Sequence, residues 1–292
     1  MSQPNTLTPG HYTRARETSS LGSGMVLTFL TSLLAGMLLV LSTASFSQIA
    51  WRFLRLVGAL ALALACVVLF WRLWQPAAAA SSCPQWTVAL LVLCALAAAG
   101  LVLFAPFAER HPRRVRGVTF LAGLAAFAAL LTPTIAPAAQ LRAERALAAL
   151  TAASQLLGTF LLGSITVAWL LGHAYLTATK MTLAPLRHFS RMLSWAVAVR
   201  FAFLPLGIAA ACFATRADAV TVRSLLVGSW LILLLRVAMG LAGVAVFAYM
   251  VADCVRLRAT QSATGILYFG SVFAYVGELA GQHLSAELGW PM

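Results

Sequence analysis

Three ionisable side chains lie inside long apolar stretches of a sequence that otherwise contains few charges. Arg200, Arg236 and Glu278 each fall well within a run of apolar residues, far from the polar segments between these runs. Of the 292 residues, 62% are hydrophobic and only 9% are charged. An ionisable group at membrane depth is costly, so by default it marks a functional site. These three residues are therefore the first candidates for chemistry.

Arg236 and Glu278 are expected at matching depths. Counted at a rise of 1.5 Å per residue, both lie roughly 25–27 Å from the same membrane face. Their charges are opposite, so we predict that they form an ion pair. Two interpretations are open. The pair could lock two helices together, or Glu278 could be proton-active while an arginine holds an anionic or carbonyl ligand.

Arg200 is expected at a shallower level, roughly 16 Å from that face, where no acid is expected. Its predicted acceptors are the hydroxyls of Thr166 and Ser164 and the backbone carbonyl freed by Pro205. An arginine satisfied by neutral groups alone could receive a quinone carbonyl, a lipid phosphate or a carboxylate. Arg200, Arg236, Glu278 and Thr166 are thus the candidate ligand-binding or proton-active residues.

The last apolar stretch has two further patterns. Tyr268 and Tyr275 are one heptad apart and share a helix face. Gly277 and Gly281 form a GxxxG pair, which allows another helix to approach closely. We therefore expect Glu278, which lies between these glycines, to contact protein and not lipid.

Two histidines mark a candidate cofactor site. His173 ends one apolar stretch and His188 begins the next, so both are expected near the same membrane face. Neutral imidazoles at equal depth on neighbouring helices could ligate a b-type haem. Alternatively, they are interfacial residues that contact headgroups or backbone carbonyls. No metal-binding Cys or His spacing and no catalytic motif occurs, so neither a metal site nor a catalytic residue is predicted.

Membrane-spanning helices must position these residues. About 20 apolar residues cross a bilayer core. Eight stretches are long enough: Gly24–Ser47, Trp51–Trp74, Trp86–Phe107, Val115–Ala136, Leu147–Thr177, Phe189–Ala214, Val222–Val251 and Gln261–Leu284. A soluble domain would carry about 25% charged residues, so that class is excluded. The sequence predicts an all-α polytopic membrane helix bundle of about eight transmembrane helices.

The predicted domain organisation is simple. Residues 1–22 are expected to form a flexible N-terminal tail, and residues 23–292 a single transmembrane domain. The first apolar stretch exceeds the usual 7–15 residues of a signal-peptide core, so we expect a retained membrane helix. The fifth begins early, because an Ala-rich helical pattern already starts near Gln140. At roughly 55 Å it should either project from the membrane or bend.

The basic residues predict the orientation. Loops on one side hold eleven of them: Arg52, Arg55, Arg110, Arg113, Arg114, Arg116, Lys180, Arg187, Arg191, Arg256 and Arg258. The other side holds seven, so both termini are predicted to face outward. The four arginines over residues 110–116 could bind a partner protein or anionic lipid, or could serve topology alone. The net charge of +13 does not predict nucleic-acid binding, because no soluble domain is expected.

The chain resembles the eight-helix membrane anchor subunits of molybdenum-dependent respiratory reductases, of the dimethyl sulfoxide reductase and polysulfide reductase type. The resemblance rests on chain size, eight spans, outward termini and the Gly277-Glu278-Leu279 sequence. It implies a quinone site without haem, a partner subunit with iron–sulfur clusters, and electron transport in a bacterial inner membrane. The stretch Gly163–Leu186 also resembles a family of bacterial membrane proteins without assigned activity.

Three functions are compatible with these observations. The first is a quinone-interacting membrane subunit of a respiratory or redox complex. The second is a small permease for an anionic solute, suggested by the excess of intramembrane arginines over acids. The third is a membrane scaffold or lipid-interacting protein without catalytic activity. The bilayer is the partner common to all three.

Overall fold

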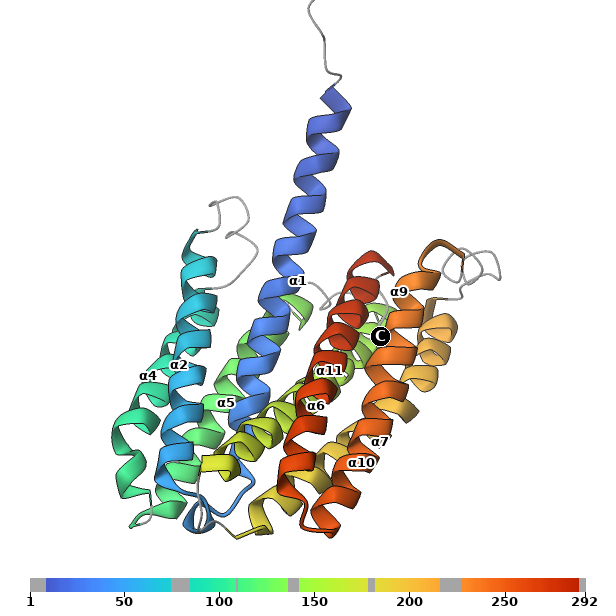
Figure 1. The fold of residues 1–292 in the computed structure, drawn as a ribbon. Helices are drawn as coiled ribbons and strands as arrows, with labels where there is room; N and C mark the ends of the chain where they lie inside the picture. The colour runs from blue at the N-terminus through green and yellow to red at the C-terminus, as the bar shows by residue number, and fades with distance from the viewer. Residues whose placement is uncertain are drawn as a thin grey trace, which may run out of the picture.

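The computed structural model describes residues 9–74, 85–108, 110–135, 142–177, 182–215 and 227–288. Over these ranges the protein consists of helices and turns and contains no strand. Eight helical segments are long and apolar enough to cross a membrane. The predicted all-α polytopic bundle is therefore confirmed, and the chain is a multi-pass membrane protein (Figure 1).

Six of the eight membrane segments are single helices: α1 (Pro9–Ser42), α2 (Trp51–Trp74), α5 (Pro112–Ile135), α6 (Arg142–Thr177), α7 (Ala184–Thr215) and α11 (Thr260–Leu288). The third in chain order combines α4 (Gln85–Phe104) with the 3-10 helix η2 (Ala105–Phe107). The seventh in chain order is composite, with α9 (Trp230–Leu234), the π-helix η4 (Leu235–Gly243) and α10 (Val244–Arg256). Helix α2 has the predicted bounds. Helix α1 begins at Pro9, inside the predicted tail, and the flexibility of residues 1–22 stays a prediction.

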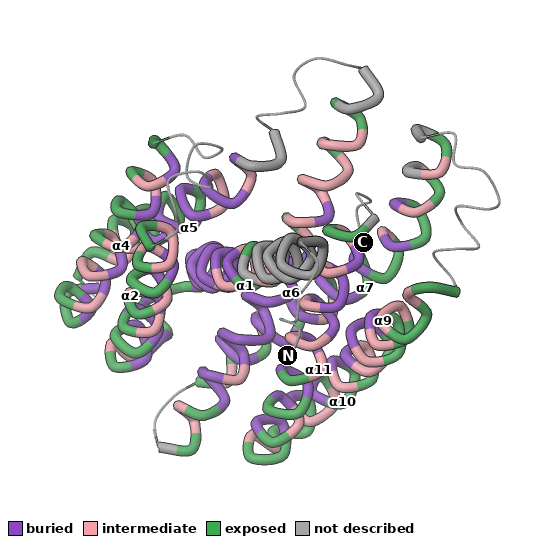
Figure 2. The backbone as a smooth tube through the Cα atoms, turned by 90° about the horizontal axis from the view of Figure 1, so that it is seen from above, coloured by how far each residue is buried: buried purple, intermediate pink, exposed green. Residues whose placement is uncertain are grey.

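Two helices occupy the centre of the bundle. Viewed from above, α1 and α6 lie between a group formed by α2, α4 and α5 and a group formed by α7, α9, α10 and α11 (Figure 2). The buried faces of α1 and α6 accordingly contain the longest runs of buried residues. The functional candidates Arg200, Arg236 and Glu278 all belong to the second group, which packs against α6.

Helix α6 lies obliquely across the bundle (Figure 1). It has 36 residues, a length of roughly 54 Å. Its inclination shortens the distance that it spans along the bundle axis. A tilt therefore accommodates the length for which a projection or a bend was predicted. Where it crosses α1, the backbones of Gly36 and Gly163 are in direct contact, and a Cβ on either glycine would collide with backbone atoms. The crossing therefore depends on the absence of side chains at these two positions.

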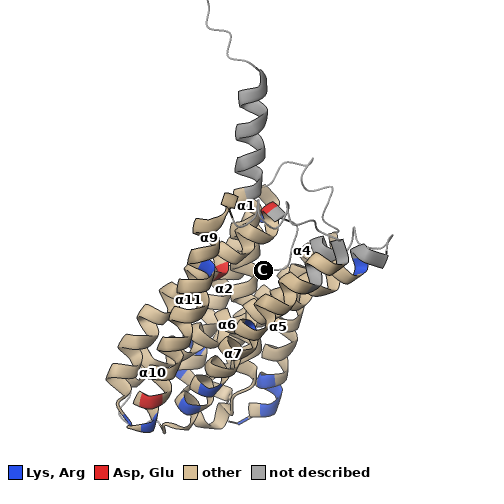
Figure 3. Ribbon diagram, turned by 90° about the vertical axis from the view of Figure 1, so that its right-hand side faces the viewer, with Lys and Arg blue, Asp and Glu red and all other residues tan. Residues whose placement is uncertain are grey.

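Basic residues gather at one end of the bundle (Figure 3). At this end α1, α4 and α10 finish and α2, α5 and α11 begin. It therefore holds Arg52 and Arg55 at the start of α2 and Arg113 and Arg116 at the start of α5. We call it the basic end. The start of α1 and the end of α11 lie at the opposite end (Figure 1).

A buried arginine–glutamate–arginine cluster as candidate functional site

Glu278 lies between two arginines in the interior of the bundle. Arg236 Nη1 donates to Glu278 Oε1 over 2.8 Å. Arg200 donates to both carboxylate oxygens, from Nε to Oε1 over 3.2 Å and from Nη2 to Oε2 over 3.1 Å. The exposed fractions are 0% for Arg236, 2% for Glu278 and 3% for Arg200. The predicted Arg236–Glu278 pair is therefore present, and it is one half of a three-residue cluster.

The predicted environment of Arg200 is wrong. Its acceptors are Glu278 and Ser154, whose Oγ and carbonyl oxygen lie 2.8 and 2.9 Å from Nη1. Thr166 instead donates to the carbonyl of Leu162, and Ser164 to that of Leu161. Neither hydroxyl is bonded to Arg200, and the guanidinium forms an ion pair.

The error came from the helix start. The predicted membrane segment starts at Phe189, but α7 begins at Ala184. Arg200 therefore lies 16 residues, roughly 24 Å, from the start of its helix, whereas Glu278 lies 18 residues, roughly 27 Å, from the start of α11. The two side chains are at the same level. The contact with Ser154 was not predicted, because Ser154 lies on α6 and the sequence gives no signal that this part of α6 packs against α7.

A π-helix presents Arg236 to α11. Arg236 is the second residue of η4, where backbone hydrogen bonds run over five residues instead of four. This widened segment packs against α11 through Gly240, on which a Cβ would lie 2.5 Å from the Cα of Gly277. The close approach lets Arg236 Nη1 also donate to the carbonyl of Gly277 over 3.0 Å. The predicted close contact at Gly277 is thus confirmed.

Two further glycines make room for the charged groups. A Cβ on Gly158 of α6 would lie 2.6 Å from Glu278 Oε2. A Cβ on Gly281 of α11 would lie 2.9 Å from Arg236 Nε. Since both distances are below any normal contact, only glycine fits at these positions without displacing the cluster. The charged groups are therefore packed against backbone on two sides.

Arg236 keeps unused hydrogen-bonding capacity. Its Nε and Nη2 atoms are buried and have no acceptor among the described residues. A buried donor that lacks an acceptor costs about 1–3 kcal/mol, and more when it is charged. The guanidinium therefore has donors suited to an acceptor atom that the described part of the chain does not supply.

A second polar cluster lies on the same face of α11, one turn from Glu278 toward the basic end. The hydroxyl of Tyr275 is 2.8 Å from Thr166 Oγ1 and accepts a hydrogen bond from Trp169 Nε1 over 3.2 Å. The Trp169 ring packs against the ring of Tyr268 at a centroid distance of 5.1 Å. Thr166 thus contributes to this cluster. The heptad spacing of Tyr268 and Tyr275 was the sequence signal for it, although Trp169 was not anticipated.

The two histidines contact different helices. His173 Nδ1 lies 3.2 Å from the hydroxyl of Tyr268 on α11. His188 Nε2 lies 2.9 Å from Thr43 Oγ1, just beyond the end of α1. Each imidazole thus has a hydroxyl partner of its own, and haem ligation by this pair stays a prediction. Among the described residues, no three His, Cys, Asp or Glu side chains are grouped as a metal site would require.

The fold and the cluster define the class: a multi-pass helical membrane protein with a buried arginine–glutamate–arginine centre. Comparison with known proteins adds no relative, because no family model, curated protein or solved structure matches the chain. Its function is therefore argued from the cluster itself.

Proposed function

We propose that the protein is a quinone-binding membrane subunit of a redox complex in a bacterial inner membrane. The observation that carries this proposal is the pair of unused donor atoms on Arg236, next to a carboxylate. A quinone headgroup needs a donor for its carbonyl oxygen and a nearby group that exchanges protons. Arg236 fills the first role and Glu278 the second.

The three charged residues would have different roles in quinone reduction. Reduction of a quinone to a quinol takes up two electrons and two protons. The electrons would come from a redox-active partner subunit, as the resemblance to reductase anchor subunits implies. Arg236 would hold a carbonyl oxygen and stabilise the negative charge that develops on it. Glu278 would pass protons, and Arg200 would hold the carboxylate in position through its two hydrogen bonds.

Protons need a path to the site. The Tyr275 hydroxyl and its partners Thr166 and Trp169 lie one helical turn from Glu278 toward the basic end. Farther along the same interface, the Tyr268 hydroxyl lies beside His173. These groups line the contact between α6 and α11, and bridging waters would complete a route along it.

Binding of short-tailed benzoquinones and naphthoquinones to the purified full chain tests the proposal. Arg236→Met removes the donors, while Glu278 keeps Arg200 as its partner. Loss of a charged hydrogen bond is worth about 1.5–3 kcal/mol, so affinity should fall roughly tenfold to a hundredfold. Arg256→Met is the matched control, since Arg256 lies on the same membrane segment and its ion pair with Asp253 is exposed. It should leave affinity unchanged.

The alternative is a permease for an anionic solute, in which Arg236 would hold a carboxylate or sulfate instead of a carbonyl. Uptake of such anions into proteoliposomes that contain the purified chain distinguishes the two. Uptake lost in Arg236→Met, together with no quinone binding by the unaltered protein, would replace the redox proposal with this one. Equal quinone binding by the unaltered protein and by Arg236→Met would also overturn the redox proposal.

A further inference from the structure

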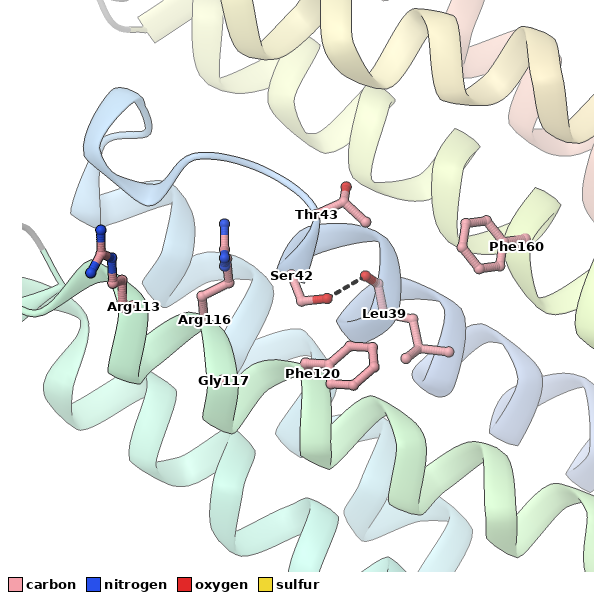
Figure 4. Close-up of a pocket in the computed structure, with 8 residues that line it drawn as sticks. All are labelled: Leu39, Ser42, Thr43, Arg113, Arg116, Gly117, Phe120 and Phe160. Atoms are coloured by element: carbon pink, nitrogen blue, oxygen red, sulfur yellow. Dashed lines mark hydrogen bonds between the residues drawn. The ribbon is translucent and has the colours of Figure 1, made fainter.

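A pocket opens between α1, α5 and α6. Its volume is about 440 Å³, within the range of about 300–1,000 Å³ typical of ligand pockets. Figure 4 shows side chains from three helices around it, with Leu39 from α1, Phe120 from α5 and Phe160 from α6. Its rim lies at the start of α5 and therefore at the basic end of the bundle.

The rim of the pocket is cationic. Arg113 and Arg116 stand one turn apart in the first two turns of α5, and their side chains extend toward the same side (Figure 4). Both are exposed. No ion pair joins either of them to a carboxylate of the described residues. Two adjacent guanidiniums that have no carboxylate partner among the described residues form a site for an anion, and guanidiniums bind phosphate through paired hydrogen bonds.

The rest of the pocket lining is mostly apolar, with Ser42 and Thr43 as its polar members. Beyond the arginines, the lining passes to Phe120, Leu39 and Phe160. Gly117 separates the two regions, and a Cβ on it would meet no atom within 4 Å. The space directly beside Gly117 is thus open.

We propose that this pocket binds an anionic phospholipid, with the headgroup phosphate on Arg113 and Arg116 and an acyl chain against Leu39, Phe120 and Phe160. Three observations support a single ligand that has both an anionic headgroup and an apolar chain. The cationic and apolar regions are continuous, the helices that form them span a membrane, and the arginines lie at the start of α5, the level of lipid headgroups.

Native mass spectrometry of the delipidated full chain, titrated with phosphatidylglycerol or phosphatidylcholine, tests this proposal. We expect phosphatidylglycerol to bind more tightly. Arg113→Ala/Arg116→Ala should weaken it about thirtyfold, a factor of about five for each arginine lost. Arg113→Lys/Arg116→Lys should retain most of the affinity, which separates charge loss from misfolding. Gly117→Phe should also abolish binding, because its ring would occupy the open space without a clash at Cβ.

The matched control is the double variant Arg52→Ala/Arg55→Ala. These arginines are also exposed, three residues apart and at the start of a helix at the basic end, but they do not line the pocket. They should leave phosphatidylglycerol binding within about twofold, since each acts only through the general surface charge. An equal loss in this control would overturn the proposal.

Two further results would also overturn it. Equal affinity for phosphatidylcholine would show that the negative charge is not recognised. Displacement of the lipid by inorganic phosphate or glycerol phosphate at similar concentrations would show that the site takes a free anion and that the apolar interior contributes nothing.

Discussion

At the scale of single residues, one carboxylate forms ion pairs with two guanidiniums. Glu278 Oε1 accepts hydrogen bonds from both arginines, and Oε2 accepts one from Arg200. Removing one member of a buried ion pair leaves an uncompensated charge. The resulting loss of stability is much larger than the stability that the intact pair contributes. Glu278 is therefore the residue on which the whole cluster depends.

Glu278→Gln should lower the free energy of unfolding by about 3–5 kcal/mol, because both arginines would remain buried without a carboxylate. Glu287→Gln on the same helix should change it by less than about 0.5 kcal/mol, since the ion pair of Glu287 with His283 is partly exposed. Unfolding by a denaturing detergent measures both variants. Equal stabilities of Glu278→Gln and Glu287→Gln would show that the cluster does not stabilise the bundle.

Tyr275→Phe should lower the free energy of unfolding by about 1–3 kcal/mol. The substitution removes the acceptor of Trp169 Nε1 and the partner of Thr166 and leaves the ring contacts in place. Tyr249→Phe is the control, because Tyr249 is 75% exposed. The same unfolding measurement applies, and an effect of Tyr249→Phe as large as that of Tyr275→Phe would contradict the interpretation.

At the scale of elements, glycines decide which helices can touch. Gly36 and Gly163 set the crossing of α1 and α6, and Gly240 and Gly277 set the contact of η4 with α11. In a membrane, helices associate through close packing and polar contacts, because burial of apolar surface provides no net driving force for helix association. The first crossing holds the two central helices together, and the second brings Arg236 to Glu278.

Gly163→Ala should destabilise the bundle by about 3 kcal/mol or more, at the upper end of overpacking effects, because the added methyl group meets the backbone of α1 and not a movable side chain. Gly100→Ala on α4 is the control. A Cβ at Gly100 would meet nothing within 4 Å, so this variant should be neutral or slightly stabilising. Thermal unfolding of the two purified variants provides the comparison. Similar unfolding midpoints would contradict the claim that the crossing of α1 and α6 requires glycine at position 163.

At the scale of the whole molecule, charge is distributed unevenly along the bundle axis. Basic residues gather at the basic end (Figure 3), whereas Glu278 lies in the half of α11 that contains its C-terminal end. Positive residues are retained on the cytoplasmic side of bacterial membranes. The expectation is therefore that the basic end, with the pocket beside Arg113 and Arg116, faces the cytoplasm.

Cysteine accessibility in intact cells tests this orientation. In a variant without native cysteines, Glu287→Cys should react with a membrane-impermeant maleimide, since it lies near the end of α11. Arg110→Cys should react only after the cells are permeabilised. The reverse pattern would place the termini in the cytoplasm and contradict the predicted topology.

Composition and apolar run length determined the class of this protein, its eight membrane segments and the pairing of Arg236 with Glu278. These properties follow from the length of a bilayer crossing and from the cost of a lone charge in lipid, both of which are local in sequence. The bounds of α2 were therefore predicted correctly, whereas the partner of Arg200 was not, because an error of five residues in a helix start displaces a side chain by roughly 7 Å.

Only the tertiary structure decided which helices meet. It brought Ser154 and Gly158 of α6 to Glu278, joined Thr166 to Tyr275, and left Arg236 with unused donors. These contacts involve the oblique helix α6 and the π-helix before α10 (Figure 1). Apolar residues alone do not specify that packing, because lipid and protein interiors are equally favourable surroundings for them.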